Sequence, residues 1–247
     1  MDQKTIGPTR VLTAEFIGTF TLIFIGAGAA TALGANHDPA VAFAHGLTIM
    51  VFIAAFGDIS GCHINPAVTI GLAAAGEFPA RRVVPYIVTQ LAGSIAAGYC
   101  LLFVFGGPVA NLGATLVDTS RITYAGAFAF EALGTFLLVN TVLHTAVRHS
   151  ASPLAPVAIG MTVTMCILGF GVLTGGSVNP ARTIGPAVAT GIYDGIAVYL
   201  AAQLVGAACA GVLYRSFWVG NAAPARTEPR GATAAAGADL SSRGPAE

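Results

Sequence analysis

Charged residues are scarce in this chain of 247 residues. Asp, Glu, Lys and Arg together make up 9% of it, against roughly 25% in soluble domains. Hydrophobic residues make up 55% and the mean hydropathy is +0.77, so the composition excludes an ordinary soluble domain and indicates a polytopic membrane protein. Because the formal net charge is zero, nothing in the composition favours nucleic acid or an acidic partner.

The sequence has few residues placed for metal binding or covalent chemistry. The four cysteines are scattered through apolar segments without CxxC spacing, so they suit neither a disulfide framework nor a zinc site. No P-loop, HExxH or Gly-x-Ser-x-Gly motif occurs, and an enzyme would need a converging nucleophile and base or a set of metal ligands. We therefore expect neither an enzyme nor a cofactor.

Long apolar segments, in contrast, run through most of the chain. Six of them fall at about 11–33, 41–56, 83–105, 125–147, 155–173 and 196–218. A helix needs about 17–25 apolar residues to cross a bilayer, and most of the six segments reach that length. The sequence therefore predicts an all-α membrane protein with six transmembrane helices.

Lysine and arginine are distributed unevenly over the ends of these segments. With six spans, one side of the membrane receives Lys4, Arg10, Arg81, Arg82, Arg148, Arg215, Arg226, Arg230 and Arg243. The opposite side has Arg121 alone. Because cytoplasmic loops carry the excess of Lys and Arg, we expect both termini in the cytoplasm and the protein in the cell membrane. The stretch 219–247 is rich in Ala, Pro, Gly and Arg and is expected to be a disordered tail.

Two short motifs interrupt the apolar pattern. Asn65-Pro66-Ala67 follows the glycine-containing stretch 60–64, and Asn179-Pro180-Ala181 follows the stretch 174–178. Asn is a favoured N-cap and Pro suits the first helical position, so each motif predicts a helix start. Glycine and proline then limit each helix to about a dozen residues, roughly 18 Å, which is only part of a bilayer core of about 30 Å. Each motif is expected to open a re-entrant half helix.

The two halves of the chain also repeat each other. Glu15-Phe16-Ile17-Gly18-Thr19-Phe20 matches Glu131-Ala132-Leu133-Gly134-Thr135-Phe136, and Gln90-Leu91-Ala92-Gly93 matches Gln203-Leu204-Val205-Gly206. Each half holds three spans, an odd number, so the second half must enter the membrane from the opposite face. We expect inverted repeats at about 8–106 and 123–218 within one channel domain over residues 1–218. Such repeats with interrupted helices indicate a transport site near the midplane, lined by non-helical backbone at 59–64 and 174–178.

This combination resembles the aquaporin, or major intrinsic protein, family over about residues 8–218. One Asn-Pro-Ala motif would be weak support, but two that open half helices of an inverted repeat are specific. The resemblance implies passive conduction of water across the lipid bilayer, one pore per chain and a homotetramer. It also implies that Asn65 and Asn179 face the pore, where the positive ends of the two half helices repel cations, protons included.

The resemblance assigns further residues, each with an alternative. Glu15 and Glu131 would accept hydrogen bonds from the re-entrant loops, the alternative being a proton relay. His63 would line the pore, the alternative being a solvated loop residue. Arg182 would be the arginine of the selectivity filter, the alternative being contact with a lipid headgroup.

In family register the outer filter falls on His45, Ile167, Gly176 and Arg182. Histidine at the first position with an aliphatic residue at the second is similar to tonoplast intrinsic proteins of plants, some of which pass ammonia as well as water. We therefore expect a channel for water and hypothesise that ammonia or other small neutral solutes also pass. One alternative is a facilitator for glycerol or urea. Another is an ion-coupled transporter, which would need more ionisable groups near the broken helices than His45 and Arg182.

Overall fold

The computed structural model describes residues 6–34, 38–147 and 152–219, so the expected tail lies outside the described residues except for Val219. The long helices are α1 (Pro8–Leu33), α2 (Pro39–Ser60), α4 (Ala80–Val104), α5 (Tyr124–Val142), α6 (Ala155–Thr174) and α8 (Ile196–Leu213). Two of them end in π-helical turns, η3 (Leu143–Val147) after α5 and η4 (Tyr214–Val219) after α8. In the described part of the chain, six helices are long and apolar enough to cross a membrane, which confirms the predicted spans.

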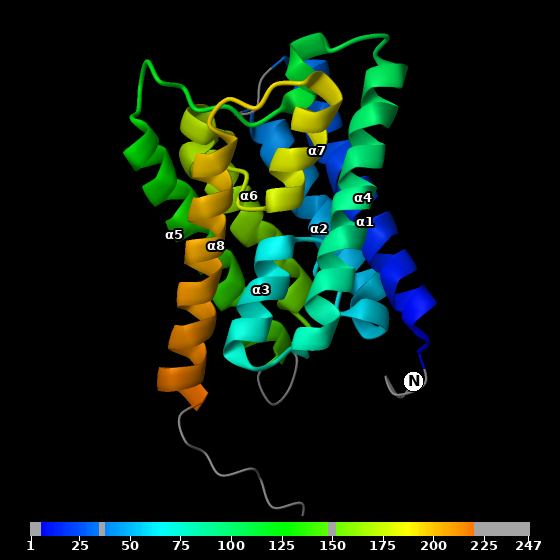
Figure 1. The fold of residues 1–247 in the computed structure, drawn as a ribbon, viewed down its shortest axis with the longest axis vertical. Coiled ribbons are helices and arrows are strands. Elements are labelled where there is room, and N and C mark those ends of the chain that lie inside the picture. The colour runs from blue at the N-terminus through cyan, green and yellow to red at the C-terminus, as the bar shows by residue number, and fades with distance from the viewer. Residues whose placement is uncertain (1–5, 35–37, 148–151, 220–247) are drawn as a thin grey trace, which may run out of the picture.

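Two short helices lie among the long ones, α3 (Pro66–Ala75) and α7 (Pro180–Thr190). With 10 and 11 residues, each is about 15–17 Å long at 1.5 Å per residue, as expected of half helices. In Figure 1, α3 occupies the lower half of the bundle and α7 the upper half, and the two described chain ends lie at the lower face. The half helices therefore enter from opposite faces.

One expectation about the loops was wrong. The backbone at 59–60 and at Thr174 was expected to be non-helical, but it belongs to the last turns of α2 and α6. Both helices end at the following glycine, Gly61 with φ of 84° and Gly175 with φ of 79°. Glycine adopts this left-handed conformation without steric cost, so the helix stops there and not at the start of the polar stretch.

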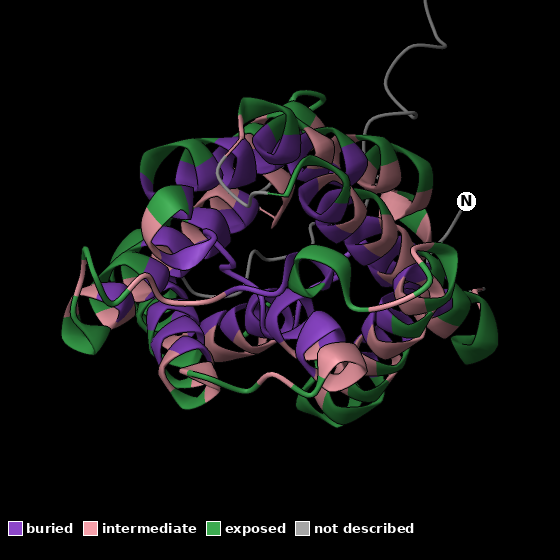
Figure 2. Ribbon diagram, turned by 90° about the horizontal axis from the view of Figure 1, so that it is seen from above, coloured by how far each residue is buried: buried purple, intermediate pink, exposed green. Residues whose placement is uncertain are grey.

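The helices pack in pairs that follow the repeat. α1 packs against α4 as α5 packs against α8. Each half helix lies against a long helix of the other half of the chain, α3 against α8 and α7 against α4, so neither half forms a complete bundle alone. Viewed along the bundle axis, the buried sides of the helices face one another and the exposed sides face outward (Figure 2).

Matched glycines set the separation of these pairs. A Cβ atom on Gly93 of α4 would lie 2.6 Å from the carbonyl oxygen of Phe16 in α1, and one on Gly206 of α8 would lie 2.1 Å from that of Ala132 in α5. Both positions accept only glycine without backbone movement. Small residues at such crossings are typical of membrane helices, because they let the backbones approach closely.

The arginines of the described residues are distributed unevenly between the two faces of the bundle. Arg10 and Arg81 lie in the first turns of α1 and α4, at the lower face of Figure 1, and Arg215 lies in η4, which follows α8 at the same face. At the upper face Arg121 forms an ion pair with Asp118, with Nε 3.2 Å from Oδ2. Hydrogen bonds from Ser120, together with the Arg121 charge, hold the pKa of the Asp118 carboxyl below its usual range. The positive charge of Arg121 at the upper face is therefore balanced by the carboxylate of Asp118.

Candidate functional site

The N-terminal ends of the two half helices meet in the middle of the bundle. Asn65 and Asn179 cap α3 and α7 with extended backbones, and their Oδ1 atoms accept hydrogen bonds from the backbone N–H groups of Ala67 at 2.8 Å and Ala181 at 2.9 Å. Proline follows each asparagine, at the position where its missing N–H costs nothing. Local capping thus fixes both amide groups at the helix ends.

The same amides also connect the two loops. The Nδ2 atom of Asn65 donates to the carbonyl oxygen of Val178 at 2.9 Å, and Nδ2 of Asn179 donates to that of Ile64 at 3.0 Å. An amide nitrogen carries two hydrogens, so each asparagine has a second donor to offer to a molecule beside it. The structure therefore brings both predicted asparagines together at one place.

The loops reach this geometry through unusual backbone conformations. Ile64 has φ of 42° and Val178 has φ of 45°, in the left-handed region that β-branched residues almost never adopt. Such a conformation costs of order 1–3 kcal/mol and persists only where the surroundings impose it. Here the carbonyl groups of both residues accept from the opposing asparagine, while their N–H groups donate to two buried carboxylates that hold the loops.

The first carboxylate belongs to Glu15 of α1 and accepts four hydrogen bonds. Its Oε1 accepts from the hydroxyl of Ser60 at 2.7 Å and from the backbone N–H of His63 at 2.9 Å. Its Oε2 accepts from the backbone N–H of Ile64 and from the Gln90 amide, both at 2.8 Å. Glu15 is fully buried, and these donors satisfy both oxygens.

The second carboxylate, Glu131 of α5, repeats this arrangement in the other loop. It accepts from the hydroxyl of Thr174 at 2.8 Å, from the backbone N–H groups of Ser177 at 2.9 Å and Val178 at 2.8 Å, and from the Gln203 amide at 3.0 Å. Glu131 is also fully buried. Both glutamates therefore accept hydrogen bonds from their re-entrant loop, from the end of the preceding helix and from a glutamine of a neighbouring helix.

Sequence reasoning missed four residues of this scaffold. Gln90 and Gln203 donate to the glutamates, and the hydroxyls of Tyr86 and Tyr199 donate to the carbonyl oxygens of Ser60 at 2.8 Å and Thr174 at 2.6 Å. Each tyrosine precedes its glutamine by four residues, on the same face of α4 or α8. The two glutamines belong to the Gln-Leu-x-Gly repeat noted in the sequence. A polar side chain at matching positions of two apolar spans is a signal that could have indicated their structural role.

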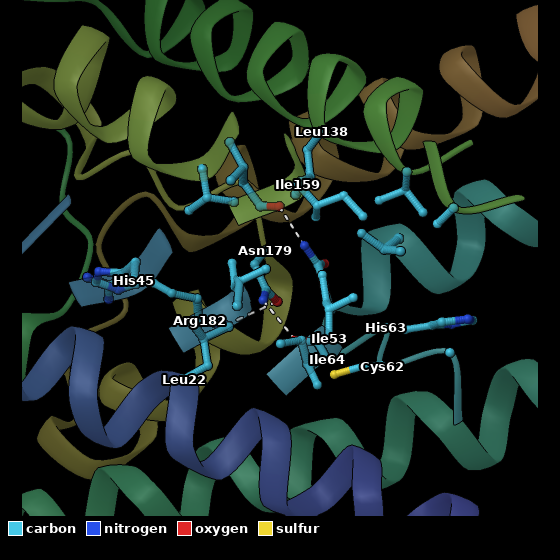
Figure 3. A pocket seen from close by; sticks show the side chains of 18 of the residues that line it. Leu22, His45, Ile53, Cys62, His63, Ile64, Leu138, Ile159, Asn179 and Arg182 are labelled. Carbon is cyan, nitrogen blue, oxygen red and sulfur yellow. Dashed lines mark hydrogen bonds between the residues drawn. The ribbon is translucent and has the colours of Figure 1, made fainter. Parts of the chain in front are cut away.

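A narrow cavity runs past the two asparagines (Figure 3). About 50 Å³ of it is accessible to the centres of water molecules, whereas one water needs about 10–15 Å³ by the same measure. Its walls are mostly apolar, formed by Leu22, Ile49, Ile53, Val68, Leu138, Ile159 and Val163. The polar groups are confined to the loops and to the two ends. The cavity can hold a short file of water molecules that exchange hydrogen bonds with few wall atoms.

Arg182 and His45 lie at one end of the cavity (Figure 3). Arg182 belongs to the first turn of α7, and its Nη1 donates to the carbonyl oxygen of Gly113 at 2.6 Å. Gly113 is the last residue of the left-handed turn η2 (Val109–Gly113) in the connection from α4 to α5. The Nδ1 atom of His45 is 2.9 Å from the carbonyl oxygen of Val41, and its ring lies against Gly26, where a Cβ atom would come within 2.4 Å of Nε2.

The other two expected filter residues are Ile167 and Gly176. Ile167 and Gly176 contact each other, since a Cβ atom on Gly176 would lie 2.9 Å from the Cα atom of Ile167. Both are buried, but neither is among the described residues that line the cavity. The structure thus brings His45 and Arg182 together on the wall of this cavity, and Ile167 and Gly176 into contact with each other.

His63 lies at the opposite end of the cavity (Figure 3). Its Nδ1 is 3.1 Å from the Thr69 hydroxyl oxygen, and its ring packs against Phe78 and Tyr86 at centroid distances of 4.7 and 5.0 Å. These contacts fix the ring within the aromatic cluster of Phe78 and Tyr86. His63 is 8% exposed, so it is held by the protein on most sides and is not a freely solvated loop residue.

Six spans, two facing half helices and a cavity with polar groups at its centre define a membrane channel with an inverted repeat. The chain belongs to the major intrinsic protein family, whose model matches residues 2–214. This family consists of passive channels in membranes and not of enzymes, so the chain is an integral, multi-pass membrane protein.

Individual relatives cover nearly the whole chain. Aquaporin AqpM of Methanothermobacter thermautotrophicus is 39% identical over 238 residues, covering 84% of this chain and 96% of the relative. Aquaporin TIP2-1 of Arabidopsis thaliana is 38% identical over 235 residues, covering 89% and 92%. The X-ray structure of the aquaglyceroporin from Plasmodium falciparum has a TM-score of 0.71 and 25% identity, covering 85% of this chain and 96% of that structure. The resemblance inferred from the two Asn-Pro-Ala motifs is therefore confirmed.

Proposed function

We propose that this chain conducts water passively and in both directions through the cavity between the half helices. The observation that carries the proposal is the pair of asparagine amides, each fixed by its own cap and by the opposing loop. A water molecule between them finds two donors for its oxygen and an apolar wall elsewhere. It therefore loses few hydrogen bonds on passing and is not bound tightly enough to stay.

The same centre would exclude ions. Each half helix carries roughly half a positive charge at its N-terminus, and both N-termini point at the centre. Arg182 adds a full positive charge at one end of the cavity. A cation, hydronium included, would lose most of its hydration in a cavity of this width and meet two regions of positive potential.

The arginines at the lower face of Figure 1 support termini in the cytoplasm, because cytoplasmic loops carry the positive excess. In that orientation Arg182 and His45 form the outer end of the pore and His63 the cytoplasmic end. We also propose assembly as a homotetramer with one pore per chain. A molar mass four times that of the chain, measured by light scattering with the detergent subtracted, would support the tetramer, and a monomeric mass would contradict it.

Osmotic shrinkage of proteoliposomes in a stopped-flow instrument tests water conduction. We expect shrinkage much faster than that of empty vesicles, and its loss in Asn179→Leu, which removes the donor on the cavity. Asn140→Leu on α5, outside the cavity wall, is the matched control and should conduct as the wild type does. Shrinkage no faster than in empty vesicles, with folded protein present, would contradict the proposal.

We also propose ammonia as a second substrate, because of the environment of His45 at the outer end of the cavity. The Nε2 atom of His45 is buried without a hydrogen-bond partner among the described residues, beside Arg182 on the cavity wall. Ile167, the expected filter residue on α6, adds a buried apolar side chain against Gly176. Apolar surroundings with one weak polar group discriminate less between water and ammonia than a wall of strong hydrogen-bonding groups.

The ammonia proposal is tested by the pH change inside vesicles after an ammonium gradient, with glycerol and urea fluxes measured in parallel. We expect the wild type to move ammonia faster than empty vesicles and the double variant His45→Phe with Ile167→His to lose this flux but keep water conduction. If the wild type conducts water well but not ammonia, a water-only channel remains. If glycerol passes readily, the protein is a glycerol-type facilitator.

A further inference from the structure

A groove on the outer wall of the bundle combines an apolar surface with the positive charge of an arginine. It lies between the N-terminal ends of α1 and α4, has a volume of about 310 Å³ and is lined by Ile6, Val11, Leu12, Arg82, Pro85 and Tyr86. All of these except Arg82 present apolar or aromatic surface. The groove is separate from the channel cavity, with which it shares none of its lining residues.

Arg82 lines this groove, and Arg81 precedes it on α4. Arg81 and Arg82 occupy the first turn of α4, which contains no acidic residue, and the N-cap Pro79 provides no side-chain hydrogen bond. Within residues 6–34, 38–147 and 152–219 neither arginine forms an ion pair, and the pair of Arg121 with Asp118 lies on the other face. Two cations at the positive end of a helix repel its dipole, so this arrangement favours an anionic ligand.

The inverted repeat supplies an internal comparison. Tyr86 and Gln90 correspond to Tyr199 and Gln203, which places Asp194 and Gly195 at the positions of Arg81 and Arg82. The scaffold is the same at both faces, whereas the charge at the start of the helix is reversed. The fold therefore does not require the arginine pair at this position.

We propose that this groove binds an anionic phospholipid, with an acyl chain along the apolar floor and the phosphate at Arg81 and Arg82. The two arginines begin a membrane-spanning helix, at the depth where headgroup phosphates lie. Guanidinium groups bind phosphate oxygens through paired hydrogen bonds, and basic pockets between helices on the cytoplasmic side suit anionic headgroups. A ligand with both an anionic head and a long apolar tail matches both parts of the groove.

The bound lipid would contact the inner end of the pore through one side chain. Tyr86 forms part of the groove wall, donates to the carbonyl oxygen of Ser60 at 2.8 Å and packs against the His63 ring at 5.0 Å. A lipid that fills the groove holds Tyr86 in this position and keeps His63 in place beside the cavity. This consequence rests on the proposed water conduction, whereas the binding itself does not.

Binding is tested on the full-length protein in detergent by native mass spectrometry, with phosphatidylglycerol and phosphatidylcholine of identical acyl chains. We expect the wild type to retain phosphatidylglycerol in several-fold excess, and the double variant Arg81→Gln with Arg82→Gln to lose this preference. Arg215→Gln, on the same face in η4 after α8, is the matched control and should keep it. Leu12→Trp, which fills the groove and leaves both arginines, should weaken binding of both lipids.

Several outcomes would overturn the proposal. Equal loss in Arg215→Gln would mean that the total charge of the face attracts the lipid. Full competition by glycerol 3-phosphate would mean a phosphate site without a role for the apolar floor. A smaller oligomer in the double variant, with lipid retention unchanged, would mean that the groove is a contact between subunits. Equal melting temperatures of all variants in phosphatidylcholine establish that they are folded.

The effect on the pore is measured separately, as water permeability in vesicles with and without phosphatidylglycerol. We expect the anionic lipid to raise the permeability of the wild type and to leave that of the double variant unchanged. If the lipid binds but wild-type permeability is the same in both vesicles, the link through Tyr86 is wrong while the binding site stands. If no variant conducts water in either vesicle, the proposed function fails and the mass spectrometry still decides the site.

Discussion

The two re-entrant loops share one scaffold but present different side chains to the cavity. In both loops a buried glutamate accepts two backbone N–H groups, one hydroxyl and one glutamine amide, and a tyrosine hydroxyl donates to the carbonyl that ends the preceding helix. Three pairs differ in chemical character, namely Cys62 and Gly176, His63 and Ser177, and Val68 and Arg182. The buried backbone groups of both loops must find hydrogen-bond partners, so the same supporting residues are needed in each loop. The side chains that face the cavity are not under this constraint and can differ between the two loops.

The neighbouring helices extend this difference. His45 on α2 corresponds to Ile159 on α6, and the space that its ring needs is provided by Gly26, whose counterpart on α5 is Val142. The carbonyl that holds Arg182 comes from Gly113, in the connection between the two repeats. The polar end of the pore is therefore built from residues that the other half lacks, and we expect selectivity to reside there.

Loss of either carboxylate should reduce stability more than any other change considered, because both loops depend on a buried glutamate for their hydrogen bonds. Glu15→Ala or Glu131→Ala leaves four buried donors without an acceptor, at about 1–3 kcal/mol for each donor, and releases the strained residues Ile64 or Val178. We expect a large fall in melting temperature and in the yield of folded protein from both variants, measured by size-exclusion chromatography with fluorescence detection.

Glu77→Ala is the control, because Glu77 is exposed at the end of α3. It should behave as the wild type does. The similarity of the two loops is tested by the same measurement, since the melting temperatures of Glu15→Ala and Glu131→Ala should fall by similar amounts. If Glu131→Ala unfolds the protein and Glu15→Ala does not, the two carboxylates have different roles despite their matching contacts.

The replacement Arg182→Val gives the outer loop the residue that the inner loop has at Val68, and should have the second largest effect. It removes the positive charge and the largest side chain from the outer end, so urea and glycerol fluxes should rise several-fold. The helix N-termini remain, so the proton current should stay low. Stopped-flow solute uptake and a pH-sensitive dye in the same vesicles measure both.

Arg121→Val, at an exposed site near the same end of the bundle, should leave all fluxes unchanged. A large proton current in Arg182→Val without a gain in urea or glycerol flux would show that the arginine, and not the centre, is the main barrier to ions.

The sequence predicted the parts of this site that depend on local chemistry or on the repeat. Helix starts at Asn65 and Asn179 follow from capping preferences, and the glutamate pair follows from matching positions in α1 and α5. The attachment of Arg182 to Gly113 could not be predicted, because the connection between α4 and α5 has no counterpart in the repeat. The contact between Ile167 and Gly176 joins α6 to the loop before α7, and no spacing in the sequence alone encodes it.

Gly113→Ala should have a smaller effect than Arg182→Val, because it moves the arginine and does not remove it. Gly113 has φ of 63°, and a Cβ atom would lie 2.6 Å from the carbonyl oxygen of Ala27, so the carbonyl that accepts from Arg182 must shift. The backbone strain alone costs about 1 kcal/mol. We expect urea flux between those of the wild type and of Arg182→Val, with glycerol flux nearly unchanged. A urea flux equal to that of the wild type would mean that Arg182 keeps its position without this hydrogen bond.

His63→Ser should have the smallest effect, because it gives the inner loop the residue that the outer loop has at Ser177. The variant loses the contact with the Thr69 hydroxyl, which is worth about 0.5–1.5 kcal/mol as a net hydrogen bond, and the ring contacts with Phe78 and Tyr86. The backbone N–H at position 63 still donates to Glu15, so the loop should hold its shape. We expect a slightly lower melting temperature, somewhat faster water flux through a wider inner end, and no change in the exclusion of urea or glycerol. If His63→Ser instead admits glycerol as Arg182→Val does, the inner end also selects, and the division of roles between the two loops is wrong.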